Sequence, residues 1–158
     1  MTEQQSSLEV NRDIVLTQRV VHQYNQDLIS AKGTRALGLS FLAGNQTKIV
    51  NAPPAGEAAI GFISFVATKN NTAVSVNLPP GITDKLGNNI ISCNLNKWES
   101  YTITLDEDEQ FAGAAIISNK PISVTTGANH VKQNLGGPEQ DGGFDQLVPE
   151  GLVGKEYV

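Results

Sequence analysis

The centre of the chain alternates apolar and polar residues with the two-residue period of a β-strand. Val74, Val76 and Leu78 are separated by Ser75 and Asn77. Because successive side chains of a strand point to opposite faces of a sheet, this pattern predicts a strand with one buried face and one solvated face.

The segment just before this strand is apolar on both alternating faces. It runs from Ala58 to Thr68, and its two apolar sets are Ile60, Phe62 and Val66 on one face and Ile63, Phe65 and Ala67 on the other. A strand of this kind is usually central and covered on both sides. The connector at residues 69–72 contains Asn residues that tolerate a positive φ, so the two strands are predicted to form a hairpin.

Four other segments alternate in the same way, although less regularly. They are residues 37–50, 90–95, 101–105 and 115–125. In the first of them, Leu37, Leu39 and Phe41 are expected on one face. Pro121 interrupts the last, because it lacks the N–H that a sheet ladder uses. This run therefore predicts two short strands, or one edge strand bent at residues 119–121.

Short strands separated by turn residues are typical of an antiparallel sandwich or barrel. No segment after residue 35 keeps a helical period for more than two turns, and no tandem repeat of fixed length is visible. The sequence therefore predicts an all-β, antiparallel β-sandwich-like domain over residues 36–158. Propeller-like blades are the alternative, because four strands in meander order would form one blade.

Residues 1–35 are expected to form a separate N-terminal arm. Apolar residues at heptad spacing would give a short helix one apolar seam, made by Val10, Ile14, Val21, Tyr24 and Leu28. The β-branched residues of the same stretch favour a strand or an extended arm instead. Either form exposes apolar side chains, so residues 1–30 are predicted to assemble with further copies of the chain or with a larger assembly.

The charge and hydropathy of the chain exclude two classes of function. The net charge is -5 and the eleven basic residues form no run, whereas nucleic-acid binding needs clustered Lys and Arg. No apolar run approaches the roughly 18 residues of a membrane-spanning helix. Residues 1–10 lack the features of a secretory signal. We expect this if a signal was removed, if the sequence is a fragment, or if the protein leaves the cell in a virion.

No catalytic site, metal site or cofactor is expected. His22 and His130 lie far apart in sequence, and neither has a partner at zinc-ligand spacing. Ser40 lacks the second glycine of a nucleophile elbow. Cys93, the single cysteine, is expected to be a buried and unreactive thiol in a strand. The acidic run 106–109 lacks the acid spacing and the glycine of a calcium loop, so a solvated turn is expected there.

The loop at residues 133–143 is the main candidate for a contact surface. It holds four glycines, one proline and two acids, which is too little apolar mass to pack a core. A functionless excursion is the alternative. Trp98 stands just before a strand and is expected either to pack at an edge or to stack on a sugar. The candidate binding residues are Trp98, Asn134, Glu139, Gln140, Asp141, Phe144 and Asp145.

Four motifs resemble the N-terminal domain of the IgGFc-binding protein family, in the branch of bacterial surface proteins. They are IGFISFVATKNNTAVSVNL (60–78), NKWESYTITL (96–105), AGAAIISNKPISVTTG (112–127) and FDQLVPEGLVGKEYV (144–158). Asn71 stands where this family usually carries an acidic residue. The resemblance covers residues 60–158 and is much weaker upstream. Because the family continues past GKEYV, the final residues are predicted to form an edge strand or to mark a truncated domain.

The resemblance implies a noncatalytic binding module rather than an enzyme. The family includes mucosal secreted proteins and large bacterial surface proteins, which implies an extracellular or cell-surface location and a role in adhesion. The partner would be a protein or a glycan bound through loops. The alternative is a structural protein of a bacteriophage virion, such as a head or tail fibre, in which the chain would form a trimer.

Overall fold

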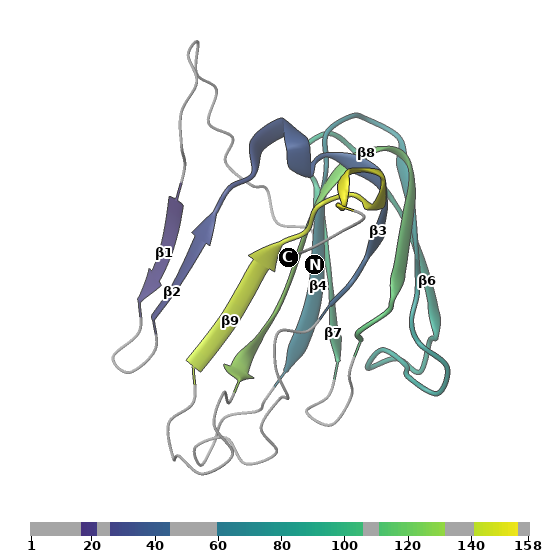
Figure 1. Cartoon of the computed structure of the whole chain (residues 1–158). Helices are drawn as coiled ribbons and strands as arrows, with labels where there is room; N and C mark the ends of the chain where they lie inside the picture. The colour runs from purple at the N-terminus through teal and green to yellow at the C-terminus, as the bar shows by residue number, and fades with distance from the viewer. Residues whose placement is uncertain (1–16, 22–25, 45–59, 106–110, 132–140, 155–158) are drawn as a thin grey trace.

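The computed structural model describes residues 17–21, 26–44, 60–105, 111–131 and 141–154, which form an antiparallel β-structure (Figure 1). The strands are β1 (Thr17–Val21), β2 (Gln26–Ser30), β3 (Gly38–Leu42), β4 (Gly61–Ala67), β5 (Thr72–Asn77), β6 (Ile90–Leu95), β7 (Ser100–Leu105), β8 (Ala115–Val131) and β9 (Asp141–Gln146). Two short 3-10 turns are η1 (Gly33–Ala36) and η2 (Glu150–Leu152). No α-helix occurs in these ranges, so the prediction of an all-β fold is confirmed.

One long strand, β8, organises the main sheet. The sheet has the order β6-β5-β8-β4-β7, and β3 and β9 also pair with β8. Residues 115–118 of β8 pair with β5, and residues 115–117 also pair with β3. Its residues from Ile122 onward pair with β4 and β9, and β3 reaches this part only through Gly38, which pairs with Ile122. β8 therefore belongs to two half-sheets, β6-β5-β8-β3 and β7-β4-β8-β9, and the sheet folds over along it.

The two half-sheets share one apolar core. Phe41, Val76 and Ile116 of the first half-sheet are buried in the same cluster as Phe65 and Val124 of the second. This arrangement confirms the predicted sandwich-like architecture. The propeller alternative is wrong, because a blade needs its strands in meander order and β8 separates β4 from β5.

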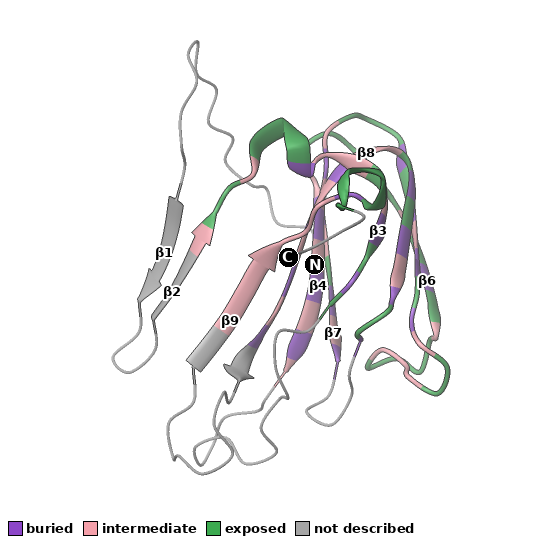
Figure 2. Cartoon of the chain, in the orientation of Figure 1, coloured by how far each residue is buried: buried purple, intermediate pink, exposed green. Residues whose placement is uncertain are grey.

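β4 is the central strand that its sequence predicts. It pairs with β7 on one side and with β8 on the other. Along β4, buried residues alternate with half-buried ones (Figure 2). The face with Ile63, Phe65 and Ala67 is buried in the core, whereas the face with Phe62 and Val66 is only half-buried. The two apolar faces of this strand are thus covered unequally.

The predicted hairpin between β4 and β5 is wrong, although both strands exist. Val74, Val76 and Leu78 are buried as predicted, but β5 pairs with β6 and β8 and not with β4. The connection at residues 68–71 instead crosses from one half-sheet to the other, and Asn71 takes a φ of 54° within it. The alternation of apolar and polar residues identified each strand correctly, because it reflects which side chains are buried. It carries no information on which strands pair.

Pro121 lies inside one continuous strand that bends at residues 119–121, as one predicted form has it, but this strand is central and not an edge strand. Residues 119–121 take part in none of the β8 registers, and they mark the point where β8 passes from one half-sheet to the other. Because neither ladder needs an N–H at that bend, proline is tolerated there in spite of the central position of the strand.

Leu39 is also placed differently from its prediction. Its side chain is 49% exposed, whereas Phe41, expected on the same face, is fully buried. The register between β3 and β8 shifts between Gly38 and Ser40. Over this step β3 advances by two residues whereas β8 advances by five, from Ile117 to Ile122, so Leu39 is not part of the register and the two-residue period of burial is interrupted there.

The β1–β2 hairpin gives the extended version of the predicted N-terminal arm, at least for residues 17–21 and 26–30. β2 lies against β9 (Figure 1). Just after β2, the backbone N–H of Lys32 donates to Gln146 Oε1 at 2.6 Å, and Lys32 Nζ lies 2.6 Å from Asp145 Oδ1. These contacts fasten the end of the arm to an edge strand of the second half-sheet. Three residues of the predicted helical seam lie outside the described ranges.

Candidate binding surface

The predicted contact loop is described only in part. Several predicted features lie outside the described residues: Asn134, Glu139, Gln140, the acidic run 106–109 and residues 156–158. The loop predicted at 133–143 is too long at its end, because β9 already begins at Asp141. The glycines of this segment suggested a loop, but Gly142 and Gly143 belong to β9.

β8 and β9 approach each other closely because glycine occupies the position where they meet. Gly127 pairs with Phe144, and a Cβ added at Gly127 would lie 2.4 Å from the carbonyl oxygen of Gly143. No side chain fits at that distance, so the pairing requires glycine at this position. The approach also brings the ring of Phe144 to 5.5 Å from that of Phe62.

Phe144 and Asp145, two of the predicted binding residues, make contacts within the chain. Phe144 covers the half-buried face of β4 through Phe62, and Asp145 forms the ion pair with Lys32. Trp98 lies elsewhere, because its backbone N–H donates to the carbonyl of Ala67 at the other end of β4. The five residue steps from Phe62 to Ala67 span about 17 Å of strand. Among the described residues, Phe144 and Asp145 therefore do not share a site with Trp98.

Trp98 occupies an unusual backbone position. The turn at residues 96–99 is closed by a 3.0 Å hydrogen bond from the N–H of Glu99 to the carbonyl of Asn96, and Trp98 is its third residue, with a φ of 70°. A turn whose third residue has a positive φ normally carries Gly or Asn there. For a bulky residue this conformation costs about 1–2 kcal/mol. The backbone conformation of this turn would by itself favour Gly or Asn at position 98.

Trp98 is also accessible, because 37% of its surface is exposed. The ammonium group of Lys97 lies 4.8 Å from the centre of the indole ring, which is within the range of a cation–π contact. The side chain thus presents part of a flat apolar ring beside a positive charge. Residues held in strained conformations cluster at functional sites, which makes Trp98 the main candidate for a contact residue.

Three sheet-crossing connections meet at Trp98, and we name them together the Trp98 end: residues 68–71, 96–99 and 119–121. Asn70 links all three, because its Oδ1 accepts from the N–H of Lys97 at 3.0 Å and its carbonyl accepts from Lys120 Nζ at 2.7 Å. The hydroxyl of Thr68 donates to the carbonyl of Pro121. These bonds make one connected surface from segments that are distant in the sequence.

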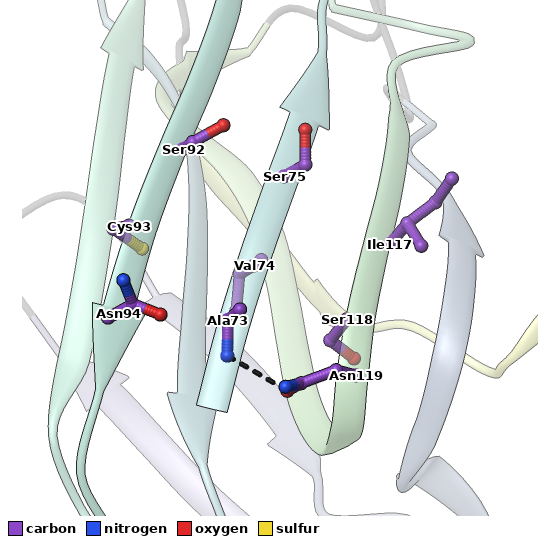
Figure 3. Close-up of a pocket in the computed structure, with 9 residues that line it drawn as sticks. All are labelled: Ala73, Val74, Ser75, Ser92, Cys93, Asn94, Ile117, Ser118 and Asn119. Carbon is purple, nitrogen blue, oxygen red and sulfur yellow. Dashed lines mark hydrogen bonds between the residues drawn. The ribbon is translucent and has the colours of Figure 1, made fainter. Parts of the chain in front are cut away.

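Sequence reasoning identified Trp98 but missed its neighbours. Asn119 accepts the N–H of Ala73 through Oδ1 at 2.9 Å, shown as a dashed line in Figure 3, and so anchors the bend of β8 to the start of β5. Lys69, Asn70 and Lys120 belong to the same end. The available signal was the concentration of Asn and Lys in all three connections, which becomes meaningful only when the fold brings them together.

The charge of the Trp98 end is opposite to that of the chain. Lys69, Lys97 and Lys120 stand against one acid, Glu99, which leaves an excess of two positive charges on a chain of net charge -5. Glu99 uses Oε2 to accept the backbone N–H of Asn96 at 2.6 Å. The surface around Trp98 therefore favours groups that carry negative charge.

A shallow, open depression of about 430 Å³ lies on the first half-sheet, bordered by Ala73, Val74, Ser75, Ser92, Cys93, Asn94, Ile117, Ser118 and Asn119 (Figure 3). Cys93 is half-buried there instead of fully buried as expected, and its burial raises the pKa of the thiol. A raised pKa keeps the thiol protonated and unreactive near neutral pH. In the described part of the chain, no three His, Cys, Asp or Glu side chains are grouped to hold a metal ion.

The chain belongs to the IgGFc binding protein family, whose model matches residues 31–158. The match begins well upstream of residue 60, where the sequence motifs become recognisable, and directly after β2. No curated protein and no solved structure matches the chain.

This is a family of noncatalytic binding domains, typically found in secreted or extracellular proteins and implying a protein partner. The match gives no support to the virion alternative. Among the described residues, no helix is long and apolar enough to cross a membrane.

Proposed function

We propose that this chain is an extracellular adhesion module that binds a glycoprotein at the Trp98 end. The observation that carries the proposal is the conformation of Trp98. A bulky, partly exposed aromatic residue occupies a turn position that favours glycine. The turn would be more stable with glycine, so we assign the ring to a contact outside the chain.

The rigidity of the surrounding surface supports the same role. The Trp98 end is held by hydrogen bonds among three connections, and its turn continues directly from the pairing of β4 with β7, since Ala67 donates to the carbonyl of Glu99 at 3.0 Å. Binding residues on loops that a rigid sheet positions lose little conformational freedom when a partner is bound.

Two substitutions at Trp98 separate binding from folding. Trp98→Gly removes the ring and also the backbone strain, whereas Trp98→Ala removes the ring and keeps the strain. Both should weaken binding by about tenfold or more, as expected for an aromatic contact residue. The glycine variant should be about 1 kcal/mol more stable than the alanine variant, because the position has a positive φ.

Binding can be measured by biolayer interferometry on two immobilised glycoproteins. They are the Fc fragment of immunoglobulin G, chosen because of the family name, and fetuin, a sialylated glycoprotein. Leu86→Ala is the matched control, because Leu86 is 82% exposed in the connection at the opposite end of the sandwich. The proposal is contradicted if the wild-type chain binds neither protein, or if both Trp98 variants bind as tightly as the wild type.

A further inference from the structure

We infer that the group bound at the Trp98 end is an anionic sugar on the glycan of the partner, an inference that rests on the proposed function. The hydrogen-bonding groups of this surface carry the inference. Several of its acceptors, including the side-chain oxygens of Asn70 and Asn119, are already used within the chain, whereas its lysines supply donors and positive charge, so the ligand should supply acceptors and negative charge.

Several acceptors of the Trp98 end already accept hydrogen bonds from other groups of the chain. Asn70 Oδ1 and Asn119 Oδ1 each accept a backbone N–H, from Lys97 and Ala73 respectively. The Asn70 carbonyl accepts from Lys120. One carboxylate oxygen of Glu99 and the carbonyls of Lys69, Asn96 and Pro121 also accept from neighbouring groups.

The groups left over include several donors. Because the oxygens of Asn70 and Asn119 are engaged inside the chain, the amide ends that these two exposed side chains offer to a ligand are their NH₂ groups. The ammonium groups of Lys69 and Lys97 and the indole N–H of Trp98 add further donors. A ligand that fits must present carboxylate, sulfate or hydroxyl oxygens.

The composition of the Trp98 end favours a sugar over a protein surface. Protein interfaces are enriched in aromatic residues, Met and Arg and depleted of Lys. Here one exposed aromatic ring is surrounded by three lysines and by Asn70, Asn71, Asn96 and Asn119. A flat ring can stack on the C–H face of a sugar, the amides can bond its hydroxyls, and Lys97 sits over the ring where an acidic substituent would lie.

Two lysines permit a test that leaves the fold intact. The contact of Lys97 with Asn70 runs through its backbone N–H, and the contact of Lys69 with Thr72 runs through its carbonyl. Replacing both side chains with Gln therefore removes charge without removing these bonds. Lys120 is unsuitable, because its ammonium group holds the Asn70 carbonyl. Lys85→Gln, in the connection at the opposite end, removes one equivalent charge as a control.

The experiment compares four immobilised probes: fetuin, enzymatically desialylated fetuin, heparin as a sulfated sugar, and polyglutamate as an acidic peptide. The wild-type chain should bind fetuin at least about tenfold more tightly than desialylated fetuin, or bind heparin with a similar preference. The Lys69→Gln/Lys97→Gln variant should lose about threefold to tenfold of that affinity, as expected for two partly exposed charge contacts. The binding should weaken as salt concentration rises, whereas Lys85→Gln should leave it unchanged.

The inference is overturned if desialylated fetuin binds as tightly as fetuin and heparin does not bind, or if polyglutamate binds as tightly as the anionic sugars. It is also overturned if the double lysine variant binds like the wild type. These outcomes differ from failure of the proposed function. In that case the Trp98 variants keep full binding, whereas failure of the inference alone leaves binding dependent on Trp98 but indifferent to acidic sugars.

Discussion

Phe65 is 1% exposed, and its ring lies 5.9 Å from that of Tyr101 across the β4–β7 pair. Phe65→Ala should lower the free energy of unfolding by about 3–5 kcal/mol, because the ring is enclosed by the core and its loss leaves a cavity. Urea unfolding with a constant m-value measures this change. Phe62→Ala, on the half-buried face of the same strand, should cost less. A loss below about 1 kcal/mol for Phe65→Ala would mean that the core is centred elsewhere.

Single residues also show which features the sequence can predict: it predicts side-chain burial in a strand better than it predicts backbone conformation in a turn. Alternation groups Phe65 with Ile63 and Ala67 on one face of β4, because the side-chain period of a strand is two, but the opposite face is also apolar and only the fold decides which face is fully buried. The backbone of Trp98 could not be predicted, because a turn at this place normally selects Gly or Asn and the sequence offers a tryptophan. The exposure of Leu39 was missed for a related reason, since a bulge has no reliable signature in one sequence.

At the scale of elements, the pairing of β8 with β9 depends on Gly127. A Cβ there would lie 2.4 Å from the carbonyl oxygen of Gly143 and 2.5 Å from the ring of Phe144, so Gly127→Ala must push β9 away. We expect a loss of about 1–3 kcal/mol in the free energy of unfolding, as for other overpacked sites. Amide hydrogens of β9 should also exchange faster than in the wild type, while those of β4 and β7 keep their protection.

Gly151→Ala is the matched control for this prediction, because a Cβ at Gly151 meets nothing within 4 Å. It should leave both stability and exchange unchanged within about 0.5 kcal/mol. Equal effects of the two substitutions, or normal β9 protection in Gly127→Ala, would show that the close approach of the strands does not limit the side chain at this position.

At the scale of the whole molecule, the N-terminal segment carries the prediction of assembly. Removal of residues 1–30 should convert an oligomer into a monomer, because this segment is predicted to expose apolar side chains outside the main domain. Sedimentation velocity of the intact and shortened chains at tens of micromolar measures the change, with circular dichroism to confirm that the shortened chain keeps its β-structure. If the intact chain already sediments as a monomer, the segment has no assembly role.

The sequence by itself determined the all-β class, the positions of the principal strands, the inward face of β5 and the family. These features depend on local alternation and on short motifs, and both involve residues that are close together in the sequence. It also marked Trp98 as a candidate, but it gave this residue no neighbours.

Only the tertiary structure decided which strands pair. In the sheet, β8 lies between β4 and β5, so the segment with Pro121 that was predicted as an edge is central. Residues 141–143, predicted as the end of a loop, belong to strand β9. The tertiary structure also assembled the Trp98 end from connections that lie up to about fifty residues apart, as Asn70 and Lys120 do. The physical reason is that alternation fixes the face on which a side chain is buried, whereas partner choice depends on long-range packing and hydrogen bonds that no local pattern encodes.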